Sequence, residues 1–194
     1  MAEIVLWSIL IAAVPSRVAS CLAGLITDLH EQTQFLDNVE ILTLLDNKQR
    51  SVGAKRNALL QLAQGDYVSF IDDDDQIADD YVLSIVDKLK LGPDVVCFDV
   101  LCTVGKQKKY CHYGIEYNGY RCRNLPNGDE EWWTRPYHLH PWRKSVVGWF
   151  PNISLGEDTQ WGSNIDISQV RQEKIDKTLY YYRYNPKATE IERK

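Results

Sequence analysis

The chain has no long hydrophobic run and no excess of basic residues. Its most apolar stretch, Ile4 to Val14, is too short to cross a bilayer and lacks the basic flank of a signal sequence. The 194 residues hold 22 Lys and Arg against 27 Asp and Glu, which gives a net charge of −5, and there is no basic run. We therefore expect neither a transmembrane segment nor a nucleic-acid partner.

Cysteine is scarce and irregularly spaced. The five cysteines are an odd number without a dense framework: Cys21, Cys97, Cys102, Cys111 and Cys122. No C-x-x-C pair occurs, so a zinc site built from the last three cysteines and His112 is disfavoured. Without a disulfide framework or a signal sequence, we expect a reducing, cytoplasmic setting.

The two standard phosphate-binding loops are also absent. The chain contains no G-x-x-x-x-G-K-[ST] segment and no G-x-G-x-x-G after its first predicted strand, so a bound nucleotide must be held in another way. Repeats and low-complexity segments are missing as well. With 44% hydrophobic residues the chain can bury a full core, and its length suits one domain or a domain with an appendage.

An acidic run after an apolar segment is the most informative feature present. Tyr67 to Ile71 is short and β-prone, which predicts a buried strand, and Asp72, Asp73, Asp74 and Asp75 follow it. Open α/β sheets bind ligands at the carboxyl ends of their strands. Adjacent carboxylates repel one another unless a cation neutralises them, and hard oxygen ligands favour Mg²⁺ or Mn²⁺. The run predicts a divalent-cation site; a helix cap is the alternative, although a cap requires only one carboxylate.

Strands and helices alternate in the first half of the chain. We predict strands at 3–13, 39–45, 67–71 and 95–101, and helices near 18–29, 51–64 and 79–90, with Gly65 as the stop of the second helix. Strict alternation is typical of an α/β fold with a mostly parallel, doubly wound sheet.

The composition changes after Cys102. Tyrosines and glycines suggest short antiparallel strands and turns, and five of the six tryptophans lie between Trp132 and Trp161. We therefore divide the chain into a nucleotide-binding half, residues 1–101, and a substrate-specific half, residues 102–194, of one domain.

Three segments carry a resemblance to a known family. Ser51-Val52-Gly53-Ala54-Lys55-Arg56-Asn57, followed by Gly65 to Asp75, resembles the G-x-x-x-A-R-N … G-x-[YW]-[IV]-x-F-[LI]-D-x-D-D pattern of family 2 glycosyltransferases. Gly156-Glu157-Asp158 resembles the G-E-D of that family, and Leu179 to Tyr184 resembles its terminal L-Y-x-Y-R. The resemblance implies the Rossmann-like GT-A fold and a metal-dependent, inverting transfer from a nucleoside-diphosphate sugar. It also implies that residues 1–101 are the nucleotide-sugar-binding half of the domain and residues 102–194 its acceptor-binding half.

The resemblance implies roles for the acidic run. Asp74 matches the aspartate that binds Mn²⁺ or Mg²⁺, and Asp72 matches the one that meets the ribose or a metal-bound water. Asp75 is the next candidate for either role. Asp73, at the variable position, is grouped with the donor-binding residues, and the pattern assigns its charge no role. The metal would stabilise charge on the departing diphosphate as a Lewis acid.

Other donor contacts follow from the same resemblance. Arg56 is a candidate to grip ribose or phosphate, with a surface arginine as the alternative. Asp46, preceded by Leu45 where the family often has a second acid, matches the residue that bonds the base. The segment Ala13-Val14-Pro15-Ser16-Arg17 departs from the family's P-x-Y-N. Ala13 and Val14 then fall where the base would lie, Arg17 falls beside them, and uridine remains the expected base. Arg183 offers a phosphate contact.

Inverting transfer requires a general base, which removes the proton of the acceptor hydroxyl. Asp158 matches the base of the family, with Glu157 beside it. The alternative is that both acids only start a helix, where negative charge favours the macrodipole.

Aromatic residues and histidines of the second half are candidates for the acceptor side. Trp132, Trp133, Trp142 and Trp161 could stack on an acceptor sugar, and core packing explains some of them equally well, while Trp149 and Phe150 are expected in the core. His138 and His140 could approach the diphosphate or the metal, and an ordinary hydrogen-bonded histidine is the preferred interpretation of each.

Two other functions fit parts of the pattern. A phosphohydrolase of the haloacid-dehalogenase kind also uses a strand that ends in D-x-D, although there the aspartates lie on an early strand and Gln76 would be Thr or Val. A catalytically silent sugar- or nucleotide-binding domain would keep the fold. The leading hypothesis is a UDP-sugar glycosyltransferase that acts on a glycan or lipid-linked acceptor.

Overall fold

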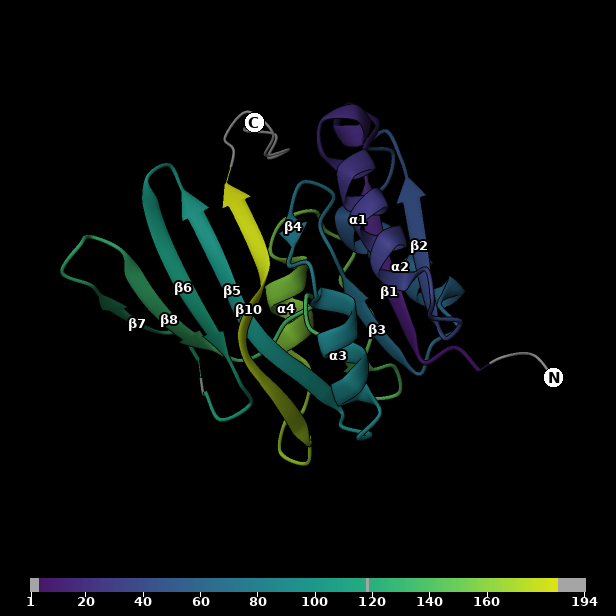
Figure 1. Cartoon of the computed structure of the whole chain (residues 1–194). Helices are drawn as coiled ribbons and strands as arrows, with labels where there is room; N and C mark the ends of the chain where they lie inside the picture. The colour runs from purple at the N-terminus through teal and green to yellow at the C-terminus, as the bar shows by residue number, and fades with distance from the viewer. Residues whose placement is uncertain (1–3, 118, 185–194) are drawn as a thin grey trace.

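A single ten-stranded mixed sheet organises the molecule. The computed structural model describes residues 4–117 and 119–184. The strands lie in the order β2-β1-β3-β9-β5-β6-β8-β7, and β10 pairs with β5 and with β4 (Figure 1). Their bounds are β1 Trp7–Ala13, β2 Val39–Leu45, β3 Tyr67–Phe70, β4 Gln76–Ile77, β5 Val95–Val104, β6 Gln107–Tyr113, β7 Arg121–Asn124, β8 Glu130–Thr134, β9 Trp142–Arg143 and β10 Gln172–Tyr184.

The centre of the sheet is parallel, as predicted. β1 pairs in parallel with β2 and β3, and β5 pairs in parallel with β10. The two-residue β9 joins these groups because Trp142 pairs antiparallel with both Val68 and Val95. In β5, Val95 to Phe98 are buried, as expected for a strand covered on both faces.

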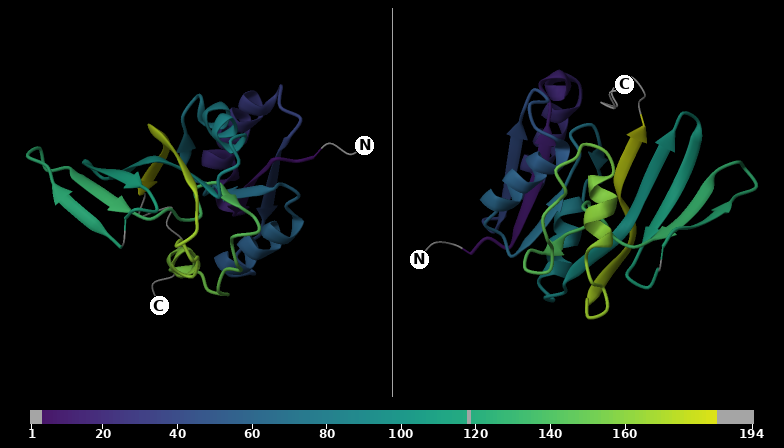
Figure 2. Two further views of the ribbon diagram at one scale, coloured as in Figure 1. Left: turned by 90° about the horizontal axis from the view of Figure 1, so that it is seen from below. Right: turned by 180° about the vertical axis from the view of Figure 1, so that it is seen from behind.

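Helices cover both faces of the sheet. The described residues form the α-helices α1 Ala23–Thr33, α2 Val52–Leu62, α3 Tyr81–Leu89 and α4 Glu157–Ser163. A short 3₁₀ turn, Pro15–Arg17, and a π turn, Val18–Leu22, precede α1. α1 contacts α3 on one face, and α2 contacts α4 on the other (Figure 2). None of the helices in residues 4–117 and 119–184 is long and apolar enough to cross a bilayer.

The second half differs in part from the antiparallel arrangement that its turns predicted. β5 and β6 form an antiparallel hairpin and β7 pairs antiparallel with β8, but β6 and β8 are parallel. The long β10 returns to lie beside β5, so one sheet contains strands of both halves. The division at residue 101 into donor and acceptor halves stays a prediction.

Gly65 has a different role from the predicted helix stop. α2 ends at Leu62, and Ala63 already has extended backbone angles. A Cβ on Gly65 would lie 2.7 Å from the backbone nitrogen of Ser8 in the segment that leads through β1. Glycine is required at position 65 because two segments of the backbone approach closely, and not because the turn needs a left-handed conformation.

The start of α2 is shaped to receive a distant loop. Ser51 caps the helix because its Oγ accepts a hydrogen bond from the Ala54 nitrogen at 3.0 Å. A Cβ on Gly53 would lie 1.9 Å from the carbonyl oxygen of Pro151. The side chain of Asn57 accepts from the Phe150 nitrogen at 2.8 Å and donates to the Phe150 oxygen at 2.9 Å. These contacts fix the loop that leads into α4.

Replacement of Gly53 tests this close approach. Gly24 also lies in a helix, with nothing within 4 Å of an added Cβ. Alanine is favoured over glycine in helices by about 0.5–1 kcal/mol, so Gly24→Ala should raise the free energy of unfolding by up to that amount. Gly53→Ala should lower it by about 1–3 kcal/mol, because the loop must move. Urea denaturation measures both; equal stability of Gly53→Ala and wild type would contradict the contact.

Candidate functional site

Three segments meet at the carboxyl ends of β1 and β3. The acidic run follows β3, and the Val14–Arg17 turn follows β1. The first residues of α4 lie on the other side, where Arg56 of α2 binds both Glu157 and Asp72. The backbone nitrogen of Phe70 donates to the His138 oxygen at 2.8 Å, which brings the 135–141 loop onto the same edge.

Arg56 connects the acidic run to α4. Its Nη2 donates to Asp72 Oδ1 at 2.9 Å and its Nη1 donates to Glu157 Oε1 at 2.8 Å. The residue is 3% exposed, and its guanidinium lies over the rings of Phe70 and Phe150 at 5.6 and 5.4 Å. Arg56 is therefore a buried link between two carboxylates, and the alternative of a surface arginine is wrong.

Asp72 remains ionised in this setting. Burial acts to raise the pKa of its carboxyl, but the Arg56 guanidinium, which also donates to Asp72 Oδ1, outweighs burial and holds the pKa well below its usual range. About a third of the side chain is exposed, so the carboxylate still faces the open side of the edge.

Arg17 neutralises the middle of the run. Its Nη1 donates to Asp73 Oδ1 at 2.5 Å, and Nη1 and Nη2 each lie 3.1 Å from an oxygen of Asp74. The Val14 nitrogen donates to Asp73 Oδ2 at 2.9 Å. Asp73 is buried, so it has a role that the pattern did not assign, namely to hold the turn after β1. Burial raises the pKa of Asp74 to about 6, with Arg17 opposing the shift.

Asp75 is neutralised by a proton. Tyr180 of β10 donates to its Oδ2 at 2.7 Å, and among the described residues its buried Oδ1 has no hydrogen-bond partner. Burial and then the charge of Asp72 raise the pKa of Asp75 to about 9, although the Tyr180 hydrogen bond opposes the shift. Asp75 is therefore a neutral, buried anchor for β10 at pH 7.

The donor set only partly fits a divalent cation. Within the part of the chain that the structure describes, no three His, Cys, Asp or Glu side chains form a metal-binding group. Mg²⁺ usually takes one or two protein carboxylates and completes its shell with phosphate and water. Asp74 meets that requirement, because it is partly exposed at the edge, but both its oxygens contact Arg17.

Asp158 lies at the open side of the edge, next to the linked carboxylates. Its side chain is 37% exposed, whereas that of Glu157 is buried against Arg56. The Thr159 nitrogen donates to Asp158 Oδ1 at 2.7 Å, and Oδ2 lies 3.8 Å from His138 Nδ1. The Asp158 carboxylate is thus accessible from solvent, whereas the Glu157 carboxylate is occupied by its ion pair with Arg56.

The remaining donor candidates are more dispersed. The Ala13 carbonyl oxygen accepts from the Asp46 nitrogen at 3.2 Å and lies 3.5 Å from the buried Lys55 Nζ, which the sequence did not single out. Asp46 Oδ1 accepts from the Gln49 nitrogen at 2.9 Å and closes the turn after β2. The side chain of Arg183 is exposed.

The two histidines differ. His140 is fully buried, its Nε2 contacts the Phe98 oxygen at 3.2 Å, and burial lowers its pKa to about 3. His140 is therefore an ordinary hydrogen-bonded histidine of the core, which was the preferred interpretation of the sequence. His138 lies 3.8 Å from both Asp72 and Asp158, at the centre of the site.

The tryptophan predictions need correction. Trp142 and Trp161 are in the core and cannot stack on an acceptor, while Trp149, expected in the core, is 64% exposed. Trp132 pairs with the buried Cys111 and packs toward the core, and Trp133 projects to the opposite face of the sheet, where it stacks on His112. Alternation along β8 therefore separates these two candidates.

Tyr120 is an aromatic residue on the side of Asp158 that the sequence did not indicate. It is 60% exposed, lies 6.3 Å from the Trp132 ring, and accepts a hydrogen bond from Tyr137 Oη at 2.7 Å. Burial of its hydroxyl group, the Tyr137 hydrogen bond and the charge of Asp158 raise its pKa. The phenol therefore senses the charge of Asp158.

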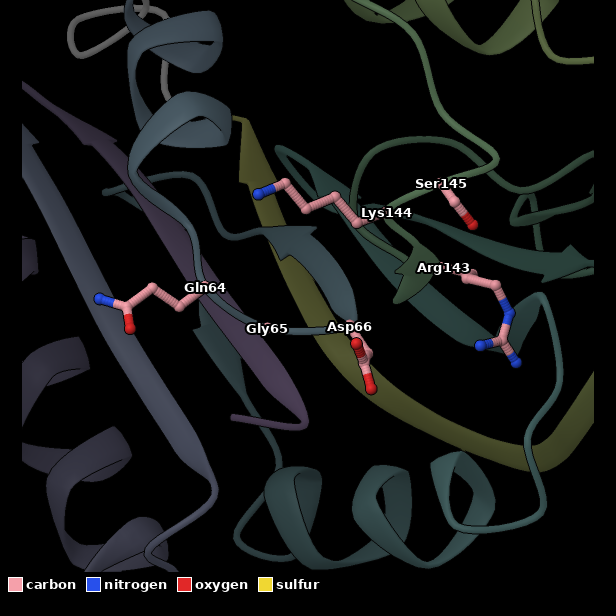
Figure 3. A pocket seen from close by; sticks show the side chains of 6 residues that line it. All are labelled: Gln64, Gly65, Asp66, Arg143, Lys144 and Ser145. Carbon is pink, nitrogen blue, oxygen red and sulfur yellow. The ribbon is translucent and has the colours of Figure 1, made fainter. Parts of the chain in front are cut away.

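A hollow at the other end of β3 is unrelated to these residues. Gln64, Gly65, Asp66, Arg143, Lys144 and Ser145 line it (Figure 3). Arg143 donates to Tyr67 Oη at 2.7 Å and to Asp94 Oδ1 at 3.1 Å, so its charge serves the fold.

The raised pKa of Asp75 predicts how stability depends on pH. An unfolded aspartate ionises near pH 4, whereas Asp75 in the folded chain keeps its proton to about pH 9. This group therefore favours folding most below about pH 4, and that contribution is lost as the pH rises toward 9. Asp75→Asn removes the titration, so its melting temperature relative to wild type should rise between pH 5 and pH 9. A parallel pH dependence in the two proteins would refute this; the exposed Asp28→Asn is the control.

Comparisons with known proteins agree on a family and a fold. The family model described as Glycosyl transferase family 2 matches residues 25–148, which include Arg56 and the acidic run but not Asp158. No curated protein sequence matches the chain.

Solved structures of one protein are similar in fold. S. aureus TarS 1–349 in complex with UDP-GlcNAc superimposes with a TM-score of 0.62 at 15% identity, over 93% of this chain and 59% of that one. The complex of TarS 1–349 with UDP gives 0.58 at 16% identity, over 93% and 61%. This chain therefore spans about three fifths of the length of those structures.

Proposed function

Because the chain belongs to glycosyl transferase family 2 and has the GT-A fold, we propose that it transfers a sugar from a nucleoside diphosphate to a hydroxyl acceptor with inversion. The observation that carries this proposal is the Arg56 link. It joins Asp72, on the proposed donor side, to Glu157 and hence to the neighbouring base candidate Asp158. Two carboxylates with separate roles then lie at one sheet edge.

The proposed donor is a UDP-sugar. The similar TarS structures are complexes with UDP-GlcNAc and with UDP, which supports uridine as the base. Ala13 and Val14, which the resemblance assigns to the base, are both buried at the end of β1, so their side chains can offer little contact surface to it. Asp72 is exposed enough to meet the ribose. Arg183 is an exposed cation on β10 that can reach a phosphate.

A divalent cation is proposed to accompany the donor. Asp74 would hold Mn²⁺ or Mg²⁺, with Asp72 beside it, and the ion would act as a Lewis acid toward the leaving diphosphate. Asp75, which is neutral and faces Tyr180, is a weaker candidate than its position in the sequence suggested. Asp74 becomes available only when Arg17 releases it.

Asp158 is proposed as the general base. Its carboxylate accepts the proton of the acceptor hydroxyl while that oxygen forms a bond to the anomeric carbon. The bond from this carbon to the diphosphate oxygen breaks, and its electron pair leaves with the diphosphate. Oδ1 already accepts a hydrogen bond from the Thr159 nitrogen, so Oδ2 is the oxygen proposed to accept the proton.

The acceptor is proposed to bind beside Tyr120. Exposed aromatic rings suit the apolar faces of sugars, and Tyr120 provides such a ring, with the partly buried Trp132 packed beside it and the charge of Asp158 acting on its hydroxyl group. A glycan or a lipid-linked sugar remains the expected class of acceptor.

The family match does not favour the haloacid-dehalogenase-like phosphohydrolase or a silent binding domain. Transfer of the sugar to water, measured as UDP release, distinguishes the glycosyltransferase from these two alternatives. A glycosyltransferase should release UDP slowly from UDP-GlcNAc with Mn²⁺ and should leave p-nitrophenyl phosphate intact. Asp158→Asn should bind UDP normally and release it about 10²–10⁴-fold more slowly, since general-base catalysis is worth that much. Phosphate release from p-nitrophenyl phosphate, or an unimpaired Asp158→Asn, would overturn the assignment.

The competition at Asp74 predicts how Mn²⁺ binds. Asp74→Asn should remove the Mn²⁺-dependent part of UDP affinity in calorimetric titration, with an unchanged circular dichroism spectrum.

The ion pair between Arg17 and Asp74 leads to a second expectation. Without nucleotide, loss of the Arg17 guanidinium should strengthen Mn²⁺ binding at least about threefold, because the Asp74 carboxylate is then no longer paired with a positive side chain. Arg17→Gln alone would strip buried Asp73 of its partner, so the variant is Arg17→Gln with Asp73→Asn. Electron paramagnetic resonance counts free Mn²⁺, and Arg17→Lys is the charge-preserving control. Unchanged Mn²⁺ affinity would contradict the competition.

A further inference from the structure

His138 occupies a central position in the site without an assigned role. The residue is 5% exposed, and its ring packs 6.3 Å from that of Phe70. Its Nε2 lies 3.8 Å from Asp72 Oδ2, and its Nδ1 lies 3.8 Å from Asp158 Oδ2. The ring therefore separates the proposed donor carboxylate from the proposed base.

The arginine contact fixes which ring nitrogen carries the proton. Arg56 Nη2 lies 3.1 Å from His138 Nε2. A guanidinium group can only donate, so Nε2 must accept with its lone pair. A neutral imidazole then carries its proton on Nδ1, and that N–H is directed to the Asp158 side of the ring.

The Nδ1–H group is buried and lacks a partner. Among the described residues no atom accepts a hydrogen bond from Nδ1. A buried donor without a hydrogen-bond partner lowers the stability of the folded protein, so a native structure that keeps one usually does so for a functional reason. Asp158 Oδ2 is 3.8 Å away, and a shift of about 1 Å in this partly exposed side chain would bring it to hydrogen-bond distance. Catalytic hydrogen bonds are often long before substrate binds.

We propose that His138 is a positioning residue that orients the general base: its Nδ1–H binds Asp158 Oδ2 and fixes the carboxylate toward the acceptor hydroxyl. This inference rests on the proposed function. Arg56 contacts the same ring, Asp72 and Glu157, so the orientation of the base is tied to the donor carboxylate. His138 touches neither reacting atom.

Substitution of His138 by asparagine or by glutamine tests the contacts of its two ring nitrogens separately, because these amide side chains differ in length. The amide nitrogen of asparagine can lie where Nδ1 lies and donate to Asp158. Glutamine places its amide near the position of Nε2, where its oxygen can accept from Arg56, but it leaves Asp158 without a donor. A role in packing alone predicts similar losses in both variants.

The first experiment measures UDP release from UDP-GlcNAc with Mn²⁺. In His138→Gln, kcat should fall at least about tenfold while the donor KM changes less than about twofold, and His138→Asn should retain most of kcat. Equal losses in the two variants, or a more active glutamine variant, would overturn the proposal and leave the proposed function intact.

The second experiment does not depend on activity. Nitrogen-15 NMR of the imidazole side chains, with His138 assigned from its absence in His138→Gln, should find the neutral Nδ1–H form. Asp158→Asn should shift that Nδ1 signal, whereas Thr159→Ser should not. A proton on Nε2 would overturn the proposal. If the Nδ1–H form and its response to Asp158 are seen but wild type releases no UDP, the contact stands and the proposed function fails.

Discussion

Four consecutive carboxylates at the end of β3 impose the constraint on which the site depends. They can lie together only if their charges are neutralised, and each solution recruits a different part of the chain. Arg56 of α2 balances Asp72, Arg17 after β1 balances Asp73 and Asp74, and Asp75 retains a proton against Tyr180 of β10. Charge neutralisation therefore assembles segments more than a hundred residues apart at one edge.

Arg56 contributes geometry more than stability. A buried ion pair gains Coulomb energy but loses hydration, and the balance is often close to zero. Breaking such a pair leaves a charge uncompensated, so the two carboxylates are strongly confined to the positions that one guanidinium allows. Gly53 and Asn57 on the same helix dock the loop that leads to α4, which brings Glu157 to Arg56. The spacing of Gly53, Arg56 and Asn57 along α2 is thus explained by loop docking.

The sequence predicted the features that depend on local pattern. Apolar runs located β1, β2, β3 and β5, and their alternation with helices gave the parallel sheet. The four aspartates could be identified as a site, but not how each is neutralised, because Arg17 lies 56 residues from Asp73 and no spacing rule relates them. Trp142 and Trp149 were assigned in reverse, since an aromatic residue outside a periodic segment carries no signal of which way it faces. Tyr120 was missed for the same reason: its importance comes from Trp132 and Asp158, which reach it only in the folded chain.

The charge of the assembled site explains why a cation should arrive with the donor. The carboxylates of Asp72, Asp73, Asp74, Glu157 and Asp158 face the guanidinium groups of Arg17 and Arg56. Even with the nearby Lys55 counted, the cluster is negative, and a nucleoside diphosphate is negative as well. Their approach would be repulsive unless further positive charge entered with the nucleotide. A divalent ion supplies two charges where the Arg17 guanidinium supplies one. Exchange at Asp74 would also release that guanidinium beside the incoming phosphates, so the turn after β1, where the chain departs from its family, would then be part of the proposed donor site.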